Sequence, residues 1–233
     1  MVIFHTENGY MLIKKLIISV LFIVLVLSVH SQPHYNNHTG WWPAYYLKIG
    51  INKKWKVVND VQLRNFANEP LVGLIALRSG INYKINKQWN ITVGGAWFHQ
   101  QQINSSKQKT VTDELRLWEE IKNEQVFNKW QLINQLRTEQ RHFSNATGLS
   151  FRFRYKLEVQ YKFDGKWKGI VGNELMWQTN KTRSDWDQNR TYAGAEYAFN
   201  KKNQLQLLLM NWWLASKNIH QPVIRINFIQ TIN

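Results

Sequence analysis

Residues 149–163, with the sequence LSFRFRYKLEVQYKF, alternate strictly between two kinds of side chain. The odd positions are all apolar or aromatic: Leu149, Phe151, Phe153, Tyr155, Leu157, Val159, Tyr161 and Phe163. The even positions are all polar: Ser150, Arg152, Arg154, Lys156, Glu158, Gln160 and Lys162. Successive side chains of a β-strand point to opposite faces, so this segment is predicted to be a strand with one apolar face and one ionic face.

Short turn signals recur along the chain at intervals of 34, 42, 36 and 36 residues. They are Asn52-Lys53-Lys54, Asn86-Lys87-Gln88, Asn128-Lys129, Asp164-Gly165-Lys166 and Asn200-Lys201-Lys202. Asn and Asp-Gly tolerate the backbone conformations of tight hairpins. Longer polar segments separate the hairpins, roughly at residues 67–71, 101–111, 143–148, 180–188 and 216–221. Short turns that alternate with longer connections are typical of outer-membrane barrels.

The number of strands follows from the same pattern. About eleven strands are visible, starting near residues 42, 55, 72, 89, 112, 128, 149, 167, 189, 203 and 222. An antiparallel barrel with both chain ends at the short turns needs an even number, so we expect about twelve strands, with ten as the alternative. The twelfth strand would have to lie near residues 32–40, although HYNNHTG at 34–40 is a poor strand sequence.

Alternation alone does not say which face is inside. A soluble sandwich or lipocalin-like barrel turns its apolar face inward, whereas a membrane barrel turns it to lipid. Three features favour the membrane arrangement: a predicted export signal, both charge signs on the polar face, and aromatics near strand ends. Those aromatics are Trp41, Trp42, Trp55, Trp89, Trp130, Trp167, Trp177, Trp212 and Trp213. We therefore expect an all-β, antiparallel, transmembrane up-and-down β-barrel.

This orientation assigns side chains to two surfaces. The predicted lumen charge network comprises Arg64, Arg78, Glu114, Arg116, Arg137, Glu139, Arg141, Arg152, Arg154, Lys156, Glu158, Glu174, Arg190 and Arg225. The predicted lipid-facing set comprises Phe151, Phe153, Tyr155, Leu157, Tyr161, Phe163, Ile224, Ile226 and Phe228. Asn59, Asn134, Thr138 and Gln140 are exceptions, because they are polar at positions of the apolar face.

The N-terminus predicts export. Lys14 and Lys15 precede an apolar run of about 14 residues, too short to span a bilayer, and Val29-His30-Ser31 resembles a cleavage site. We expect residues 1–31 to be a signal peptide, with Met11 as an alternative start, and residues 32–233 to form a single barrel domain. An uncleaved membrane anchor is the alternative.

Composition limits the chemistry and the partners. The 233-residue chain has 30 Lys and Arg, 15 Asp and Glu, and a formal charge of +15, which becomes +14 after the predicted cleavage. An exported chain does not meet chromosomal DNA, so no nucleic-acid partner is expected. The absence of cysteine excludes disulfides, cysteine–zinc sites and thiol nucleophiles. The expected partners are outer-membrane lipid, lipopolysaccharide and, during biogenesis, the barrel-assembly machinery; the oligomeric state is open.

Several short motifs together resemble a known family. They are Trp41-Trp42, Leu63-Arg64, Glu114-Leu115-Arg116, Arg137-Thr138-Glu139-Gln140-Arg141, Phe151-Arg152-Phe153-Arg154-Tyr155, Asn173-Glu174 and Asn189-Arg190. In these the mature chain resembles the uncharacterised outer-membrane barrels, a domain-of-unknown-function family, of Bacteroidetes-type bacteria. The resemblance implies an outer-membrane barrel and no particular activity. The chain departs from common assembly signals because it ends without a terminal aromatic residue, and Phe228 is expected to serve instead.

The charged lumen is the main functional lead. Buried charges must be paired or hydrated, so reciprocal ion pairs between neighbouring strands are expected. Such a network would fill and rigidify the lumen. Alternatively, its Arg and Lys side chains would select anions in a passive pore or bind an acidic or phosphorylated ligand. The predicted role is thus structural or a small-anion pore, and non-enzymatic; a soluble periplasmic ligand-binding barrel is a further alternative.

His142-Phe143-Ser144 carries the enzymatic alternative. A His-x-Ser near a barrel rim resembles the arrangement in outer-membrane lipid A deacylases, where a His activates a Ser on the lipid side, so a lipid-modifying hydrolase would use His142 and Ser144. Such a pair needs a carboxylate to orient the His, and none is evident in the sequence. The seven His residues show no metal-ligand spacing, and no phosphate loop or dinucleotide fingerprint occurs, so neither a metal nor a cofactor is expected.

Overall fold

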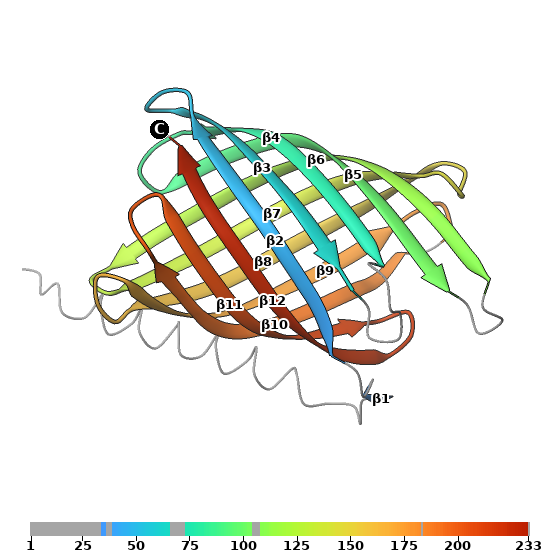
Figure 1. Cartoon of the computed structure of the whole chain (residues 1–233). Helices are drawn as coiled ribbons and strands as arrows, with labels where there is room; N and C mark the ends of the chain where they lie inside the picture. The colour runs from blue at the N-terminus through green and yellow to red at the C-terminus, as the bar shows by residue number, and fades with distance from the viewer. Residues whose placement is uncertain (1–33, 36–38, 66–72, 104–107, 183, 233) are drawn as a thin grey trace, which may run out of the picture. The chain divides into compact units, whose positions relative to one another are not determined.

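The computed structural model describes residues 34–35, 39–65, 73–103, 108–182 and 184–232 (Figure 1). These residues form an all-β domain. In this part of the chain, no helix is both long enough and apolar enough to cross a membrane. The predicted signal peptide at residues 1–31 lies outside the described residues.

Eleven long strands form one sheet that closes on itself (Figure 1). They are β2 (Gly40–Gly50), β3 (Trp55–Arg64), β4 (Leu74–Lys84), β5 (Trp89–Ile103), β6 (Lys109–Phe127), β7 (Trp130–Phe143), β8 (Leu149–Lys162), β9 (Trp167–Thr179), β10 (Ser184–Ala198), β11 (Asn203–Leu214) and β12 (Ile219–Ile232). Each strand is antiparallel to the next along the chain. β12 also pairs with β2, in parallel, from Val223 opposite Gly40 to Ile232 opposite Ile49, and this pairing closes the barrel.

The closure corrects the expectation of twelve antiparallel strands. All eleven strands seen in the sequence are present, but the described residues before Gly40 contribute only β1 (His34–Tyr35), a two-residue strand parallel to β12. An odd number of strands makes the first and the last run the same way, so the seam is parallel and the sheet is mixed. Gly40 consequently lies at the end with the long connections, whereas Ile232 lies at the end with the short turns. We call these the long-connection end and the short-turn end.

Four of the five short turns share one local structure. In each, a side-chain oxygen accepts two backbone hydrogen bonds from the residues two and three positions later. Asn52, Asn86 and Asn200 do so at 2.8–2.9 Å, and the Asp164 carboxylate accepts from Lys166 N and Trp167 N at 2.7 and 2.8 Å. These two N–H groups also hold the pKa of Asp164 below its usual value. In the fifth turn Asn128 adopts a positive φ of 55°.

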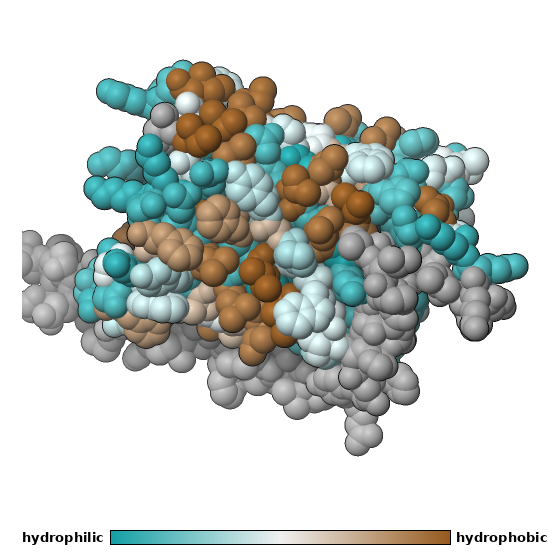
Figure 2. Space-filling view, in the orientation of Figure 1, coloured by the Kyte–Doolittle hydropathy of each residue, from teal (hydrophilic) through white to brown (hydrophobic). Residues whose placement is uncertain are grey.

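Burial shows which face is inside. In β8, Ser150, Arg152 and Arg154 are buried, whereas Phe151 and Phe153 are exposed. Leu209 on β11 is 66% exposed, and Glu139 on β7 is 2% exposed. Apolar side chains gather on the outer wall (Figure 2). The faces are therefore inverted relative to a soluble barrel, as a membrane barrel requires.

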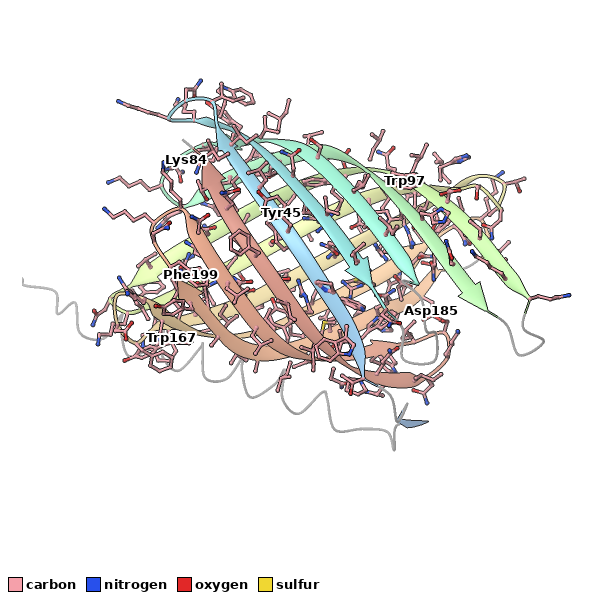
Figure 3. The ribbon with its side chains drawn as sticks, viewed as in Figure 1. Tyr45, Lys84, Trp97, Trp167, Asp185 and Phe199 are labelled. Carbon is pink, nitrogen blue, oxygen red and sulfur yellow. The ribbon has the colours of Figure 1, made fainter. Side chains whose placement is uncertain are left out.

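Aromatic pairs mark both ends of the apolar band. At the short-turn end Trp55 packs on Tyr83, Trp130 on Tyr161 and Trp167 on Tyr197, at 4.6–4.8 Å between ring centroids. At the other end lie the pairs Trp177–Trp186, Trp213–His220 and Trp97–His99. Figure 3 labels Trp167 and Phe199 at the first end, and Trp97 and Asp185 toward the second. Such aromatic bands sit at the two interfaces of a bilayer.

Two predicted members of these bands lie elsewhere. Trp42 and Trp212 point into the lumen, are buried, and pack edge to face at 5.1 Å. Their positions near strand ends suggested the outer bands, but each falls on the inward parity of its strand, so the prediction was wrong for them. Trp118 also lies in the lumen, against Gly80 and Gly94, where an added Cβ would meet the ring at 2.6–2.9 Å.

Candidate functional site

Glu139 is the centre of the charged lumen. Its carboxylate accepts hydrogen bonds from three guanidinium groups: Arg116 at 3.1 Å, Arg152 at 2.5 and 2.9 Å, and Arg154 at 2.6 Å. Arg116 comes from β6, and Arg152 and Arg154 come from β8, the two strands that flank β7. Their register sets Glu139 opposite Arg152 and two residues from Arg141, which is opposite Arg116. One carboxylate thus compensates part of the charge of three buried arginines.

The ion pairs continue on both sides of Glu139. Glu114 binds Arg116 at 2.7 Å and Arg141 at 2.5 and 3.1 Å. Glu174 binds Arg154 and, at 3.1 Å, Arg190. We call this continuous set, with Asp187 described below, the central network: Glu114, Arg116, Glu139, Arg141, Arg152, Arg154, Glu174, Asp187 and Arg190. It joins the inner walls of β6 to β10.

The other predicted lumen residues lie on the same inner face in smaller groups. Arg78 bonds Asp60 at 2.9 Å, and Arg137 bonds Glu120 at 2.8 Å. Lys156 lies 3.6 Å from Glu158, which also accepts a hydrogen bond from the Tyr192 hydroxyl at 2.7 Å. Arg225 lies over the Tyr192 ring and Arg64 over the Trp42 ring. The structure therefore places all fourteen predicted residues in the lumen, but only eight of them in the central network.

Asp187 is a lumen residue that sequence reasoning missed. A β-bulge between Trp186 and Gln188 breaks the alternation of β10, and the Asp187 carboxylate accepts a hydrogen bond from Arg152 at 3.1 Å. Simple parity cannot locate a residue beside a bulge. In the structure Trp186 and Asn189, three residues apart, are both opposite outward residues of β9, so the bulge shows itself only in the pairing of the two strands.

The predicted lipid-facing residues lie on the outer face. Phe151, Phe153, Tyr155 and Phe163 are exposed. Leu157 and Tyr161 are half-buried at outward positions of β8. Ile224, Ile226 and Phe228 are also half-buried, and they alternate with the buried Val223, Asn227 and Ile229 of β12. Two of the polar exceptions on this face bond polar side chains of the adjacent strand: Asn59 accepts a hydrogen bond from Ser79 at 2.8 Å, and Thr138 donates to Glu119 at 2.6 Å.

His142 and Ser144 lie on the outer face, at the long-connection end of β7. His142 is exposed and lines an outer groove of about 770 Å³ with Trp97, Leu115 and Leu149. Ser144 Oγ accepts a hydrogen bond from the backbone N–H of Asp113 at 3.0 Å. Among the described residues, no hydrogen bond joins His142 to Ser144. The Asp113 carboxylate instead lies 2.9 Å from Nδ1 of His99.

Asp113 is the carboxylate that sequence reasoning did not find. It lies in one cross-strand row with His99 and Ser144, because β5, β6 and the end of β7 are in register there. Asp113 occupies the middle of this row, whereas in a Ser–His–carboxylate triad the His lies between the other two. In the described part of the chain, no three His, Asp or Glu side chains are grouped so as to hold a metal ion.

These features define a class: a closed β-barrel with an apolar outer wall, aromatic bands at both ends and an ionic lumen. The family model described as "Protein of unknown function (DUF2490)" matches residues 39–221, and the chain belongs to that family. No curated protein sequence matches the chain.

Solved structures resemble the barrel in fold. In-vitro folded OmpT, an outer membrane protein of Vibrio cholerae, is 14% identical with a TM-score of 0.45, over 70% of this chain and 52% of that one. Outer-membrane expressed OmpT of Vibrio cholerae is 16% identical with a TM-score of 0.44, over 70% and 51%. The chain thus spans about half the length of these proteins, and the likeness concerns the fold alone.

Proposed function

We propose that the protein is an integral outer-membrane barrel of a Gram-negative, Bacteroidetes-type bacterium, without enzymatic activity, whose lumen is closed by the central network. Lipid and lipopolysaccharide would cover its outer wall, and the barrel-assembly machinery would insert it after signal-peptide cleavage. The role is then structural, and passage of small anions is the competing role of the same lumen.

The observation that carries this proposal is the burial of paired charges across the lumen. Glu139 and Arg152 are 2% and 3% exposed, and Arg190 and Glu174 are each 6% exposed. Lining charges of a water-filled channel would be hydrated, whereas these contact each other. Paired charges also cost less to bury than single ones, which favours a filled interior.

Ion conductance tests the closed lumen. We expect the folded protein to give no steady conductance in a planar lipid bilayer, because the central network occupies the cross-section between β6 and β10. A steady, anion-selective conductance whose selectivity weakens in Arg152→Ala or Arg154→Ala would instead establish the pore. Lys56→Ala, on the inner face at the short-turn end, is the control for loss of one lumen charge elsewhere.

A lipid-modifying hydrolase is the second candidate. The observation that favours it is the row of His99, Asp113 and Ser144, which would put a hydroxyl, an imidazole and a carboxylate on the outer face beside His142. A hydroxyl nucleophile needs a base within hydrogen-bonding reach, and catalytic hydrogen bonds can be loose before substrate binds. The outer groove next to His142 would accept an acyl chain.

Hydrolysis of lipid separates the two candidates. If the protein is non-enzymatic, vesicles of phospholipid and lipopolysaccharide will release no fatty acid above the level of a Ser144→Ala variant. Release by the wild type that is lost in Ser144→Ala, and kept in Ser184→Ala, would establish the hydrolase. Ser184 is a matched control because it is another exposed serine at the long-connection end, and it does not line the groove.

A further inference from the structure

Four buried donors at the long-connection end of the lumen lack an acceptor. Trp42 Nε1, Arg64 Nε, Arg190 Nε and Gln221 Nε2 have no hydrogen-bond partner among the described residues. Leaving one buried donor unpaired costs about 1–3 kcal/mol, so native proteins rarely leave several together. These four donors therefore need a hydrogen-bond acceptor, and no described residue supplies one.

The four donors belong to one cluster around Trp42. The Cζ atoms of Arg64 and Arg190 lie 4.4 and 5.1 Å from the centroid of the Trp42 ring. Gln221 Nε2 lies 3.0 Å from where a Cβ on Gly40 would be, two residues before Trp42 on the same strand face. Trp212 closes the cluster by packing on Trp42 at 5.1 Å. Side chains of β2, β3, β10, β11 and β12 therefore meet here.

The cluster has excess positive charge. In the described part of the chain, Arg64 has no carboxylate within ion-pair distance, and its Nη2 donates only to the Gln62 amide oxygen at 2.8 Å. Arg190 shares Glu174 with Arg154 and donates its Nη2 to Gln188 at 2.7 Å. Arg64 and Arg190 thus both face the Trp42 ring, and the one carboxylate that compensates their charge, Glu174, is shared with Arg154. Arg64 is half-buried, so the cluster keeps contact with solvent.

We propose that Arg64, Arg190, Trp42 and Gln221 form a binding site for a small soluble oxyanion of the phosphate type. A phosphate group offers four oxygens to donors that approach from several directions, and guanidinium groups bind it with charge-assisted hydrogen bonds. The inward orientation excludes lipid headgroups, which contact the outer wall, so the ligand enters from the solution at the long-connection end.

The phosphate site rests on the proposed charged lumen, of which it is a part, but it does not depend on the lumen being closed. The central network lies on the β6–β10 wall, and the phosphate site lies at the β2–β12 seam, with Arg190 and Glu174 as the link between them. A conducting barrel could still bind phosphate, and a closed barrel could fail to. The two proposals therefore fail separately.

Calorimetric titration of inorganic phosphate into the folded full chain, in detergent at constant ionic strength, tests the site. We expect one saturable site per chain, and binding that is about tenfold or more weaker in Arg64→Gln, since a charge-assisted contact is lost. Lys56→Gln is the matched control: it removes one lumen charge from the short-turn end of the same strand, β3, and should bind as the wild type does.

Two further variants keep the test decisive if Arg64→Gln does not fold. Arg64→Lys keeps the charge but loses the Nε donor, and Gln221→Met removes the amide donor without a change of charge; each should weaken binding several-fold. Non-saturable binding of phosphate by the wild type would overturn the site. An equal loss of affinity in Lys56→Gln and Arg64→Gln would also overturn it, because phosphate would then be attracted only by the net charge of the chain.

Discussion

Glu139→Gln is expected to cost the barrel about 3–5 kcal/mol of its free energy of unfolding, the usual cost of removing one partner of a buried ion pair. The substitution keeps the size of the side chain and one acceptor oxygen. It removes the negative charge shared by Arg116, Arg152 and Arg154, so three buried guanidinium groups lose compensation together. Urea unfolding of the barrel in lipid vesicles measures the change.

Two variants show whether the loss comes from the buried charge. Glu124→Gln breaks an ion pair with Lys122 in which both side chains are 29% exposed, and it should cost less than about 1 kcal/mol. Adding Arg152→Gln to Glu139→Gln should restore part of the stability, because the Asp187 partner left behind is accessible to water. Equal losses in the two glutamate variants would contradict the central role of Glu139.

Leu209→Arg is expected to destabilise the barrel in a bilayer by about 2–4 kcal/mol, the cost of an arginine at the membrane midplane. Leu209 points outward on β11, halfway between Leu205, which is opposite the aromatic-band residue Tyr197, and Trp213 of the other band. An Arg there would have to leave water for hydrocarbon. Urea unfolding in phospholipid vesicles, with folded and unfolded forms separated on unheated gels, gives the free energy.

The same substitution separates the membrane barrel from a soluble one. In a soluble barrel Leu209 would face water, and an exposed Leu→Arg change alters stability by no more than about 0.5 kcal/mol. Val126→Arg is the control: Val126 is 69% exposed and lies one residue from the end of β6 at the short-turn end. Its effect should be about 0–1 kcal/mol. Equal, small effects at both positions, with solubility in the absence of detergent, would refute the membrane assignment.

The parts of the fold that depend on local sequence were predictable. Strict alternation in residues 149–163 determines a strand with two unlike faces, and the Asn and Asp turn residues determine hairpins, because both rest on contacts within a few residues. The eleven long strands follow from these two signals. Strand ends were less predictable: β5 reaches Ile103 and β6 begins at Lys109, where the residues are polar and backbone pairing alone extends the ladder.

The candidate site was predictable in composition but not in connection. Parity placed Arg116, Glu139 and Arg152 on one face, because side chains in a strand alternate. Which carboxylate binds which guanidinium depends on the register of neighbouring strands, and the bulge that brings Asp187 to Arg152 changes parity within one strand. Trp42 and Trp212 were assigned to the outer aromatic bands from their positions near strand ends, whereas the alternation of their strands places them inside.

The sequence by itself thus determined a chain of two-faced strands joined by tight turns. It predicted export, and it favoured an apolar face turned to lipid. Only the tertiary structure decided how the barrel closes. The seam between β2 and β12 joins residues about 180 positions apart in sequence, and no local pattern encodes whether they run parallel. That seam also brings Trp42, Arg64, Arg190 and Gln221 together, so the proposed phosphate site exists only once the barrel has closed.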